Sequence, residues 1–370
     1  MKTEAWDLGH RLDLPPRWDA AVHPNARVVH LDQWCWNRLV ADRAGERLSE
    51  PAAGAYDRLR QLALDGRAVF PLSQTHYLEL WERTNIDARW DTAVAMAELS
   101  GFNTTTPRGV GEWEARIAVN AFLDLGEDVP APPFFGWGWH HCVRGVTRPA
   151  QIIDTRTGAP PAIIGWTAAQ EKAFAEIGEE AVLRMELAML AMRDPMLEQH
   201  GYQPFDAHVR DAGARFTAEQ LRVRELIDEH QPKPAQLKNW LDLATFTEMT
   251  DDISRASLDL GANPVAVLSS IASAMKAGDK GAVSAFMNLM PIQRVFTALR
   301  LEAHLKRDFR FAPSDMADFW AASAGMTFAT DVVVDKRTFN LIADSGLGPE
   351  YRVKVYRRLE DVVDALEMTA

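Results

Sequence analysis

The sequence predicts an α/β fold: a mainly parallel sheet flanked by helices and interrupted by a large all-α insertion. Two observations predict it. Short β-rich runs alternate with helical patterns in residues 26–84 and again after residue 313, and such alternation favours a parallel sheet. Between about residues 91 and 306, by contrast, apolar residues recur every three or four positions, which is typical of helices.

The first part of the expected core covers residues 26–90 and follows an irregular, proline-containing arm at residues 1–25. Its expected elements are a strand at 27–31, helices at 33–42 and 52–64, a strand at 68–72 and a helix at 73–83. The first strand ends at Asp32. Ser73 is a good N-cap for the last helix, because a serine hydroxyl can accept a hydrogen bond from the first turn.

The all-α insertion is assigned to residues 91–310. Its clearest helices are expected at 167–192, 217–229, 234–259, 263–277 and 280–306. Pro291 should bend or divide the last of these helices, because proline cannot donate the helical hydrogen bond. Residues 130–166 are rich in Pro, Gly and Trp, and we expect a loop-like segment there.

The second part of the core covers residues 311–370. Its expected elements are a helix at 315–324 with Ser314 as its cap and Gly325 as its stop, a strand at 326–330, a helix at 335–342, a strand at 352–356 and a helix at 359–368. The strand at 326–330 is expected to end at Asp331. Because similar β–α units stand at both ends of the chain, we expect one domain whose strands share one sheet.

The composition is that of a folded protein. Of 370 residues, 47% are hydrophobic, which is ample for a buried core. The net charge of −12 argues against a sequence-blind polyanion binder, although it leaves room for a local basic groove. Cys35 and Cys142 do not form a disulfide framework, and no signal peptide or membrane span is evident. We therefore expect a cytoplasmic protein that does not enter membranes.

Acidic residues recur at one kind of position in the two parts of the core. They are Asp32 and Asp331 at strand ends, Glu79 in the second turn of a helix, and Asp315 and Asp318 at the start of another helix. In a parallel sheet, the carboxyl ends of the strands and the starts of the following helices share one edge, where ligands bind. Carboxylates gathered there repel one another unless a cation lies among them, and Mg²⁺ and Mn²⁺ prefer oxygen ligands.

The order of these residues resembles that of the PIN-like nucleases. Residues 28–36 (VVHLDQWCW) are similar to the family's opening strand and Asp, and residues 71–80 (PLSQTHYLEL) to its strand–Ser–helix–Glu segment. Residues 314–331 are similar to its closing Asp helix and Thr-Asp strand end. The resemblance covers about residues 26–90 and 310–345. The chain departs from the family in its insertion of about 200 residues, and in three valines that follow Asp331 where a second acidic residue is usual.

The resemblance implies a divalent-metal-dependent nuclease that hydrolyses phosphodiester bonds, with RNA favoured over DNA, and it is compatible with a toxin-like or defence role. The catalytic residues implied are Asp32, Glu79, Asp315 and Asp331, which would hold Mg²⁺ or Mn²⁺ with Asp318 as a fifth ligand. Cations at the end of the insertion, namely Lys306, Arg307 and Arg310, are expected to bind the substrate backbone.

Two alternatives stay open. In the first alternative, the chain is a non-enzymatic helical interaction protein whose insertion binds a protein partner or a second copy of the chain. In the second, it is a PIN-like scaffold without activity. Each acidic residue taken alone also fits a turn or a helix cap, and the cations fit a solvated helix end. A zinc site at residues 139–142 is disfavoured, because adjacent histidines point apart and no second ligand pair has suitable spacing. The deciding observation is whether Asp32, Glu79 and Asp331 converge; if they lie apart, the nuclease interpretation fails.

Overall fold

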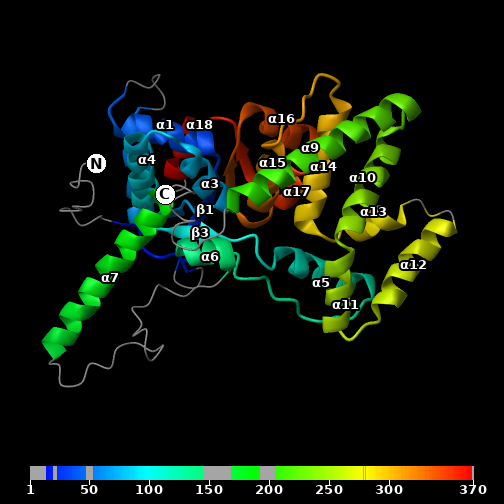
Figure 1. Cartoon of the computed structure of the whole chain (residues 1–370), viewed down its shortest axis with the longest axis horizontal. Helices are drawn as coiled ribbons and strands as arrows, with labels where there is room; N and C mark the ends of the chain where they lie inside the picture. The colour runs from blue at the N-terminus through cyan, green and yellow to red at the C-terminus, as the bar shows by residue number, and fades with distance from the viewer. Residues whose placement is uncertain are drawn as a thin grey trace.

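A central parallel sheet organises the structure. The computed structural model of the chain describes residues 14–19, 23–46, 53–145, 168–191, 205–277, 279 and 281–368. The strands, in their order across the sheet, are β2 (Ala68–Val69), β1 (Arg27–Leu31), β5 (Asp331–Val333) and β6 (Lys354–Tyr356), and all neighbours are parallel (Figure 1). The expectation that strands from both ends of the chain share one parallel sheet is confirmed.

Two apolar cores lie on opposite faces of this sheet, because successive side chains of a strand point to opposite faces. Val333 belongs to the first core, which is formed mainly by α1 (Gln33–Arg43), α2 (Ala55–Leu64), α3 (Gln74–Glu82), α4 (Ile86–Ser100) and α18 (Leu359–Met368). Val332 and Val334 belong to the second core, which is formed mainly by α9 (Phe205–His230), α14 (Pro291–Leu305), α15 (Asp315–Phe328) and α16 (Lys336–Ser345). Helices therefore cover both faces, as a parallel sheet requires.

The order of the strands changes direction at β1. The next strand along the chain, β2, pairs with one side of β1, and β5 pairs with the other side, so that Leu31 lies opposite Val333. In open α/β sheets, ligands bind in the crevice outside the carboxyl ends of the strands at such a reversal. Asp32 directly follows β1 at this point.

The middle of the chain is mostly helical, but it also contains a second sheet. β3 (Asn103–Thr105) pairs antiparallel with β4 (Phe135–Trp137), and α6 (Gly138–Arg144) follows at once. The loop expected at residues 130–166 is therefore wrong over 135–144, and its part from residue 146 onward lies outside the described residues. The other helices are α5 (Val110–Phe122), α7 (Ala168–Ala191), α10 (Pro234–Glu248), α11 (Thr250–Asp259), α12 (Pro264–Lys276), α13 (Ala282–Met287) and the short α17 (Gly348–Tyr351). Pro291 begins α14 and separates it from α13, as expected.

The insertion and the core are in close contact. In Figure 1, α7 extends away from the sheet on one side, and α5, α11 and α12 lie beyond its other side. α4 crosses the boundary that we placed at residue 90 and packs with α1 and α2. Among the described helices, none has the length and apolar character needed to cross a membrane.

The strand expected at residues 326–330 is wrong. α15 continues through Phe328, and the strand begins at Asp331. Gly325 does not end the helix but lies inside it. A Cβ built on Gly325 would be 3.2 Å from His30 Cγ and 3.2 Å from Val332 Cγ2, so a glycine there allows α15 to approach the sheet closely. The β-branched run that begins at Val332 supplies the strand instead.

Candidate functional site

Three of the predicted acidic residues line one small cavity at the carboxyl edge of the sheet. Asp32 is the N-cap residue of α1, Glu79 lies in α3, and Asp318 lies in the first turn of α15. The cavity has a volume of about 20 Å³, which is room for about one water molecule or one small ion. Segments far apart in the sequence therefore bring three carboxylates to one place.

Two of these carboxylates have no hydrogen-bond donor. Among the described residues, none donates a hydrogen bond to the side chain of Glu79 or Asp318, and neither forms an ion pair. Burial, followed by the Asp318 and Asp32 carboxylates, raises the pKa of Glu79 to about 8. Burial, followed by Asp32, Asp335 and Asp315, raises the pKa of Asp318 to about 7. Burial and the neighbouring carboxylates therefore favour the protonated forms of Glu79 and Asp318.

The Asp32 carboxylate, unlike those of Glu79 and Asp318, accepts a hydrogen bond from a described residue. Its Oδ2 accepts a hydrogen bond of 3.2 Å from the backbone N–H of Asp335. Burial, and secondly the Asp335 carboxylate, raise the pKa of Asp32. The side chain of Asp335 is itself the N-cap of α16 and accepts hydrogen bonds from Arg337 N at 2.6 Å and from Thr338 Oγ1 at 2.7 Å. Asp335 thus positions Asp32 and adds charge to the site, a role that we did not predict.

Gln33 contributes an unsatisfied amide to the same cavity. It lines the cavity beside Asp32, and only 8% of the residue is exposed. Neither its amide nitrogen nor its amide oxygen has a hydrogen-bond partner among the described residues. A buried amide without partners is costly, so the Gln33 amide is available to bond whatever enters the cavity beside the carboxylates.

Asp315 forms an ion pair with Arg337 and does not line the cavity of the other three acidic groups. Its Oδ1 lies 2.9 Å from Arg337 Nη1, and its Oδ2 accepts hydrogen bonds from Arg337 Nη2 at 3.0 Å and from Ala312 N at 2.7 Å. The Arg337 guanidinium also packs 3.7 Å above the ring centroid of Phe309. Asp315 does not line the cavity with Asp32, and its contacts indicate that it holds the loop before α15 in place.

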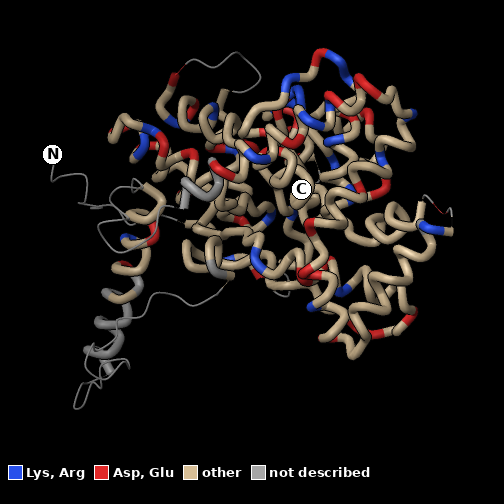
Figure 2. Tube along the Cα trace, turned by 45° about the vertical axis from the view of Figure 1, so that its right-hand side comes forward, with Lys and Arg blue, Asp and Glu red and all other residues tan. Residues whose placement is uncertain are grey.

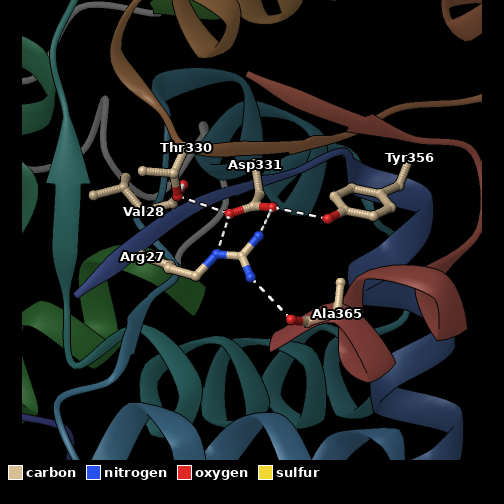
Figure 3. A network of polar contacts seen from close by, with 6 residues as sticks. All are labelled: Arg27, Val28, Thr330, Asp331, Tyr356 and Ala365. Carbon is tan, nitrogen blue, oxygen red and sulfur yellow. Dashed lines mark hydrogen bonds and ion pairs between the residues drawn. The ribbon is translucent and has the colours of Figure 1, made fainter. Parts of the chain in front are cut away.

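Asp331 is not part of the site, so Asp32, Glu79 and Asp331 do not converge, and both the ligand set that includes Asp331 and the nuclease interpretation based on that set are wrong. It begins β5 and therefore lies at the amino ends of the strands, away from Asp32. Figure 3 shows it surrounded by donors: Arg27 Nε at 2.8 Å, a second Arg27 nitrogen, Tyr356 Oη at 3.1 Å and Thr330 Oγ1 at 2.7 Å. Asp331 is fully buried, and Arg27 also donates to the carbonyl of Ala365 in α18. This is a structural ion pair that joins both ends of the chain.

The donor chemistry of the cavity suits Mg²⁺ or Mn²⁺, although no metal geometry is preformed. Carboxylate oxygens without donors are the ligands that these hard cations prefer. Within the described ranges, however, no three His, Cys, Asp or Glu side chains are already arranged to hold an ion. Binding an ion would therefore require rotation of at least some of the three carboxylates.

The histidines near the site are neutral. The Nδ1 of His76 accepts a hydrogen bond of 2.9 Å from Ser73 N, its Nε2 lies 2.8 Å from the carbonyl oxygen of Leu31, and burial lowers its pKa to about 3. His76 is thus part of the cap of α3. In the segment considered for zinc, His141 lies 2.8 Å from both Thr104 Oγ1 and the carbonyl oxygen of Pro133, which accounts for both ring nitrogens.

The predicted substrate-binding cations lie in the loop between α14 and α15. Lys306 forms an ion pair of 2.6 Å with Asp344, whereas Arg307 and Arg310 are exposed and form no ion pair with a described residue. The carbonyl of Arg310 accepts a hydrogen bond from Arg337, which links this loop to Asp315. In the view of Figure 2, basic and acidic positions are intermixed along the chain. A substrate role for these cations stays a prediction.

Comparisons of the chain with protein-family models, with curated proteins and with solved structures found no match. The resemblance to PIN-like nucleases is therefore carried by the residues alone.

Proposed function

We propose that this protein is a divalent-metal-dependent nuclease with Asp32, Glu79 and Asp318 as its metal ligands. One observation carries the proposal: these three carboxylates come from separate segments and line one cavity at the carboxyl edge of the sheet, where two of them lack donors. Carboxylates that only stabilise a fold are paired or hydrogen-bonded when they are buried, whereas Glu79 and Asp318 are half-buried and unpaired among the described residues. Titratable groups with strongly perturbed pKa values in a cavity are typical of functional sites.

The proposal does not rest on the convergence of Asp32, Glu79 and Asp331, which the structure contradicts. It rests on a different ligand set, in which Asp318 takes the place of Asp331. A bound Mg²⁺ or Mn²⁺ would place positive charge beside a phosphoryl oxygen and lower the pKa of a water molecule. In the chain itself, the Asp335 N–H orients Asp32, the Gln33 amide offers a donor and an acceptor to whatever enters the cavity, and Arg337 keeps Asp315 out of the ligand set. RNA is the substrate class that the resemblance implies.

The test is cleavage of single-stranded RNA and DNA by the purified protein with Mn²⁺ or Mg²⁺. We expect cleavage by the wild type and a loss of about a hundredfold or more in Glu79→Gln and Asp318→Asn, because metal-assisted charge stabilisation is worth several kcal/mol. Glu82→Gln is the matched control, since Glu82 lies three residues further along α3 and does not line the cavity. Absence of cleavage in the wild type on every substrate would contradict the proposal and favour a helical interaction protein.

A further inference from the structure

A second, larger cavity adjoins the acidic one. Its volume is about 400 Å³, which lies within the range of about 300–1,000 Å³ typical of small-molecule pockets. His30, Thr75 and Ala321 line both cavities and so form a shared wall. Anything bound in the larger cavity would therefore lie next to the three carboxylates of the proposed metal site.

Four aromatic side chains contribute to the walls of the larger cavity. They are Phe134, which precedes β4, Phe135, which begins β4, Phe296 from α14 and Trp320 from α15. The rings of Phe296 and Trp320 make an edge contact, with their centroids 6.3 Å apart. Flat apolar walls of this kind accept a planar ring by stacking, and bases of single-stranded nucleic acids stack on such side chains.

The residues that line the larger cavity disfavour binding of an anion. Among the described residues that line the larger cavity there is no Lys or Arg, and the one charged residue is Glu248, which is exposed. A phosphate group would thus find no cation there and would be repelled by Glu248. The occupant that fits these walls is planar and carries no negative charge.

Two buried polar side chains in the lining can bond to an occupant. His30 is 8% exposed, and its ring nitrogens have no hydrogen bond to a described residue, so they are available to an occupant of the cavity. Gln293 is 6% exposed, and its amide nitrogen lies 3.4 Å from Glu114 Oε2, while its amide oxygen accepts no hydrogen bond from a described residue. A purely apolar occupant would leave these groups unpaired, which is costly.

We infer that the larger cavity binds a nucleobase of the substrate, stacked on the aromatic walls and hydrogen-bonded to His30 and Gln293. The identity of the ligand rests on the proposed function: the base would enter this cavity while the adjoining phosphate lies across the shared wall, beside Asp32, Glu79 and Asp318. The pairing explains why an aromatic cavity without cations adjoins an acidic one.

The experiment measures binding of adenosine, guanosine, cytidine and uridine to the full chain in EDTA, by ligand-observed NMR and calorimetry. Nucleosides lack phosphate, and EDTA removes the metal, so the readout does not depend on cleavage. We expect at least one nucleoside to bind and its affinity to fall about tenfold or more in Trp320→Ala. Ala329→Phe, which fills the cavity from another side, should have the same effect and covers the case in which Trp320→Ala does not fold.

Two variants serve as controls. Trp240→Ala removes a half-buried tryptophan of α10 that does not line the cavity, and it should bind the nucleoside like the wild type. Asp318→Asn should also bind it, because it changes only the acidic cavity.

The outcomes separate the two proposals. Nucleoside binding without cleavage of any nucleic acid would support the base cavity and overturn the nuclease. Cleavage by a wild type that binds no nucleoside, or by Trp320→Ala with an unchanged KM, would overturn the base cavity and leave the nuclease in place. Binding of indole but of no nucleoside would show an apolar cavity only and would also overturn this inference.

Discussion

At the amino ends of β1 and β5, the buried carboxylate of Asp331 accepts hydrogen bonds from Arg27 and Tyr356 and lies within 2.7 Å of Thr330 Oγ1. At the carboxyl ends of the same two strands, Asp32 has a single backbone donor from a described residue outside its own helix, and Glu79 and Asp318 have none. The carboxylate at the amino edge of the sheet is thus paired, whereas those of Glu79 and Asp318 at the carboxyl edge are unpaired among the described residues. The paired edge fastens the two ends of the chain together, and the unpaired edge has the properties expected of a binding site.

The largest expected effect on stability comes from the paired edge. Asp331→Asn should destabilise the protein by about 3 kcal/mol or more, because it leaves the Arg27 guanidinium without its buried partner. Asp318→Asn, the same substitution at the other edge, should cost little or stabilise the protein. Urea unfolding of both variants at pH 7 measures the difference. Equal destabilisation would remove the distinction between the two edges.

The second effect is the response to metal. Saturating Mn²⁺ should stabilise the wild type by about 1–3 kcal/mol through its binding to the folded state. Asp32→Asn and Asp318→Asn should lose most of this gain, while Asp331→Asn should keep it although it starts from a lower melting temperature. Thermal unfolding with and without Mn²⁺ is the measurement. A gain that survives in Asp318→Asn but disappears in Asp331→Asn would reverse our assignment of the two edges.

The sequence predicted the sheet and the convergence of Asp32, Glu79 and Asp318 because these features depend on local patterns. The run at residues 27–31, the cap at Ser73 and the two aspartates that open α15 lie where the pattern indicated. The position of Asp331 differs from the prediction because the β-branched run that follows it, and not residues 326–330, forms the strand. With the strand at this β-branched run, the acidic residue that follows the strand is Asp335.

Other features could not be predicted, because they depend on tertiary contacts. The helix α15 runs through Gly325 since the glycine packs against His30 and Val332, and its packing against His30 joins segments about 300 residues apart. Asp318 and not Asp315 is available as a proposed metal ligand, because Arg337 at the start of α16 forms an ion pair with Asp315. Both aspartates lie one turn apart on one helix, so spacing alone does not distinguish them.

The third effect is the pH dependence of the unpaired edge without metal. The groups that face Glu79 are Asp318, Asp32, Glu82 and Arg83, and its pKa is about 8, against 4.5 for an ordinary Glu. A carboxyl whose pKa is raised by folding contributes stability that is present below about pH 4.5 and is lost as the pH rises through 8. We expect stability in EDTA to fall by about 1 kcal/mol between pH 5 and 8, with Asp318 contributing at its pKa of about 7. Glu79→Gln should flatten this fall and Glu82→Gln should not, as urea unfolding across that range would show.

The smallest expected effect concerns the cations that we assign to the substrate. Arg307 and Arg310 are exposed and without ion pairs among the described residues, so replacing both with Ala should change stability by less than about 0.5 kcal/mol. If they bind phosphates, the dependence of RNA affinity on salt should decrease by roughly one unit of slope for each phosphate that the variant no longer binds. Lys306 is left in place because loss of its ion pair with Asp344 would change stability as well as binding.

The control is Lys354→Ala, which removes an exposed cation at the start of β6 and so at the paired edge, and which should leave the slope unchanged. Binding of a short single-stranded RNA at three or more salt concentrations decides the matter. If the slope decreases in Lys354→Ala and not in the double variant, the substrate backbone runs along the paired edge, and the loop between α14 and α15 is an ordinary solvated turn.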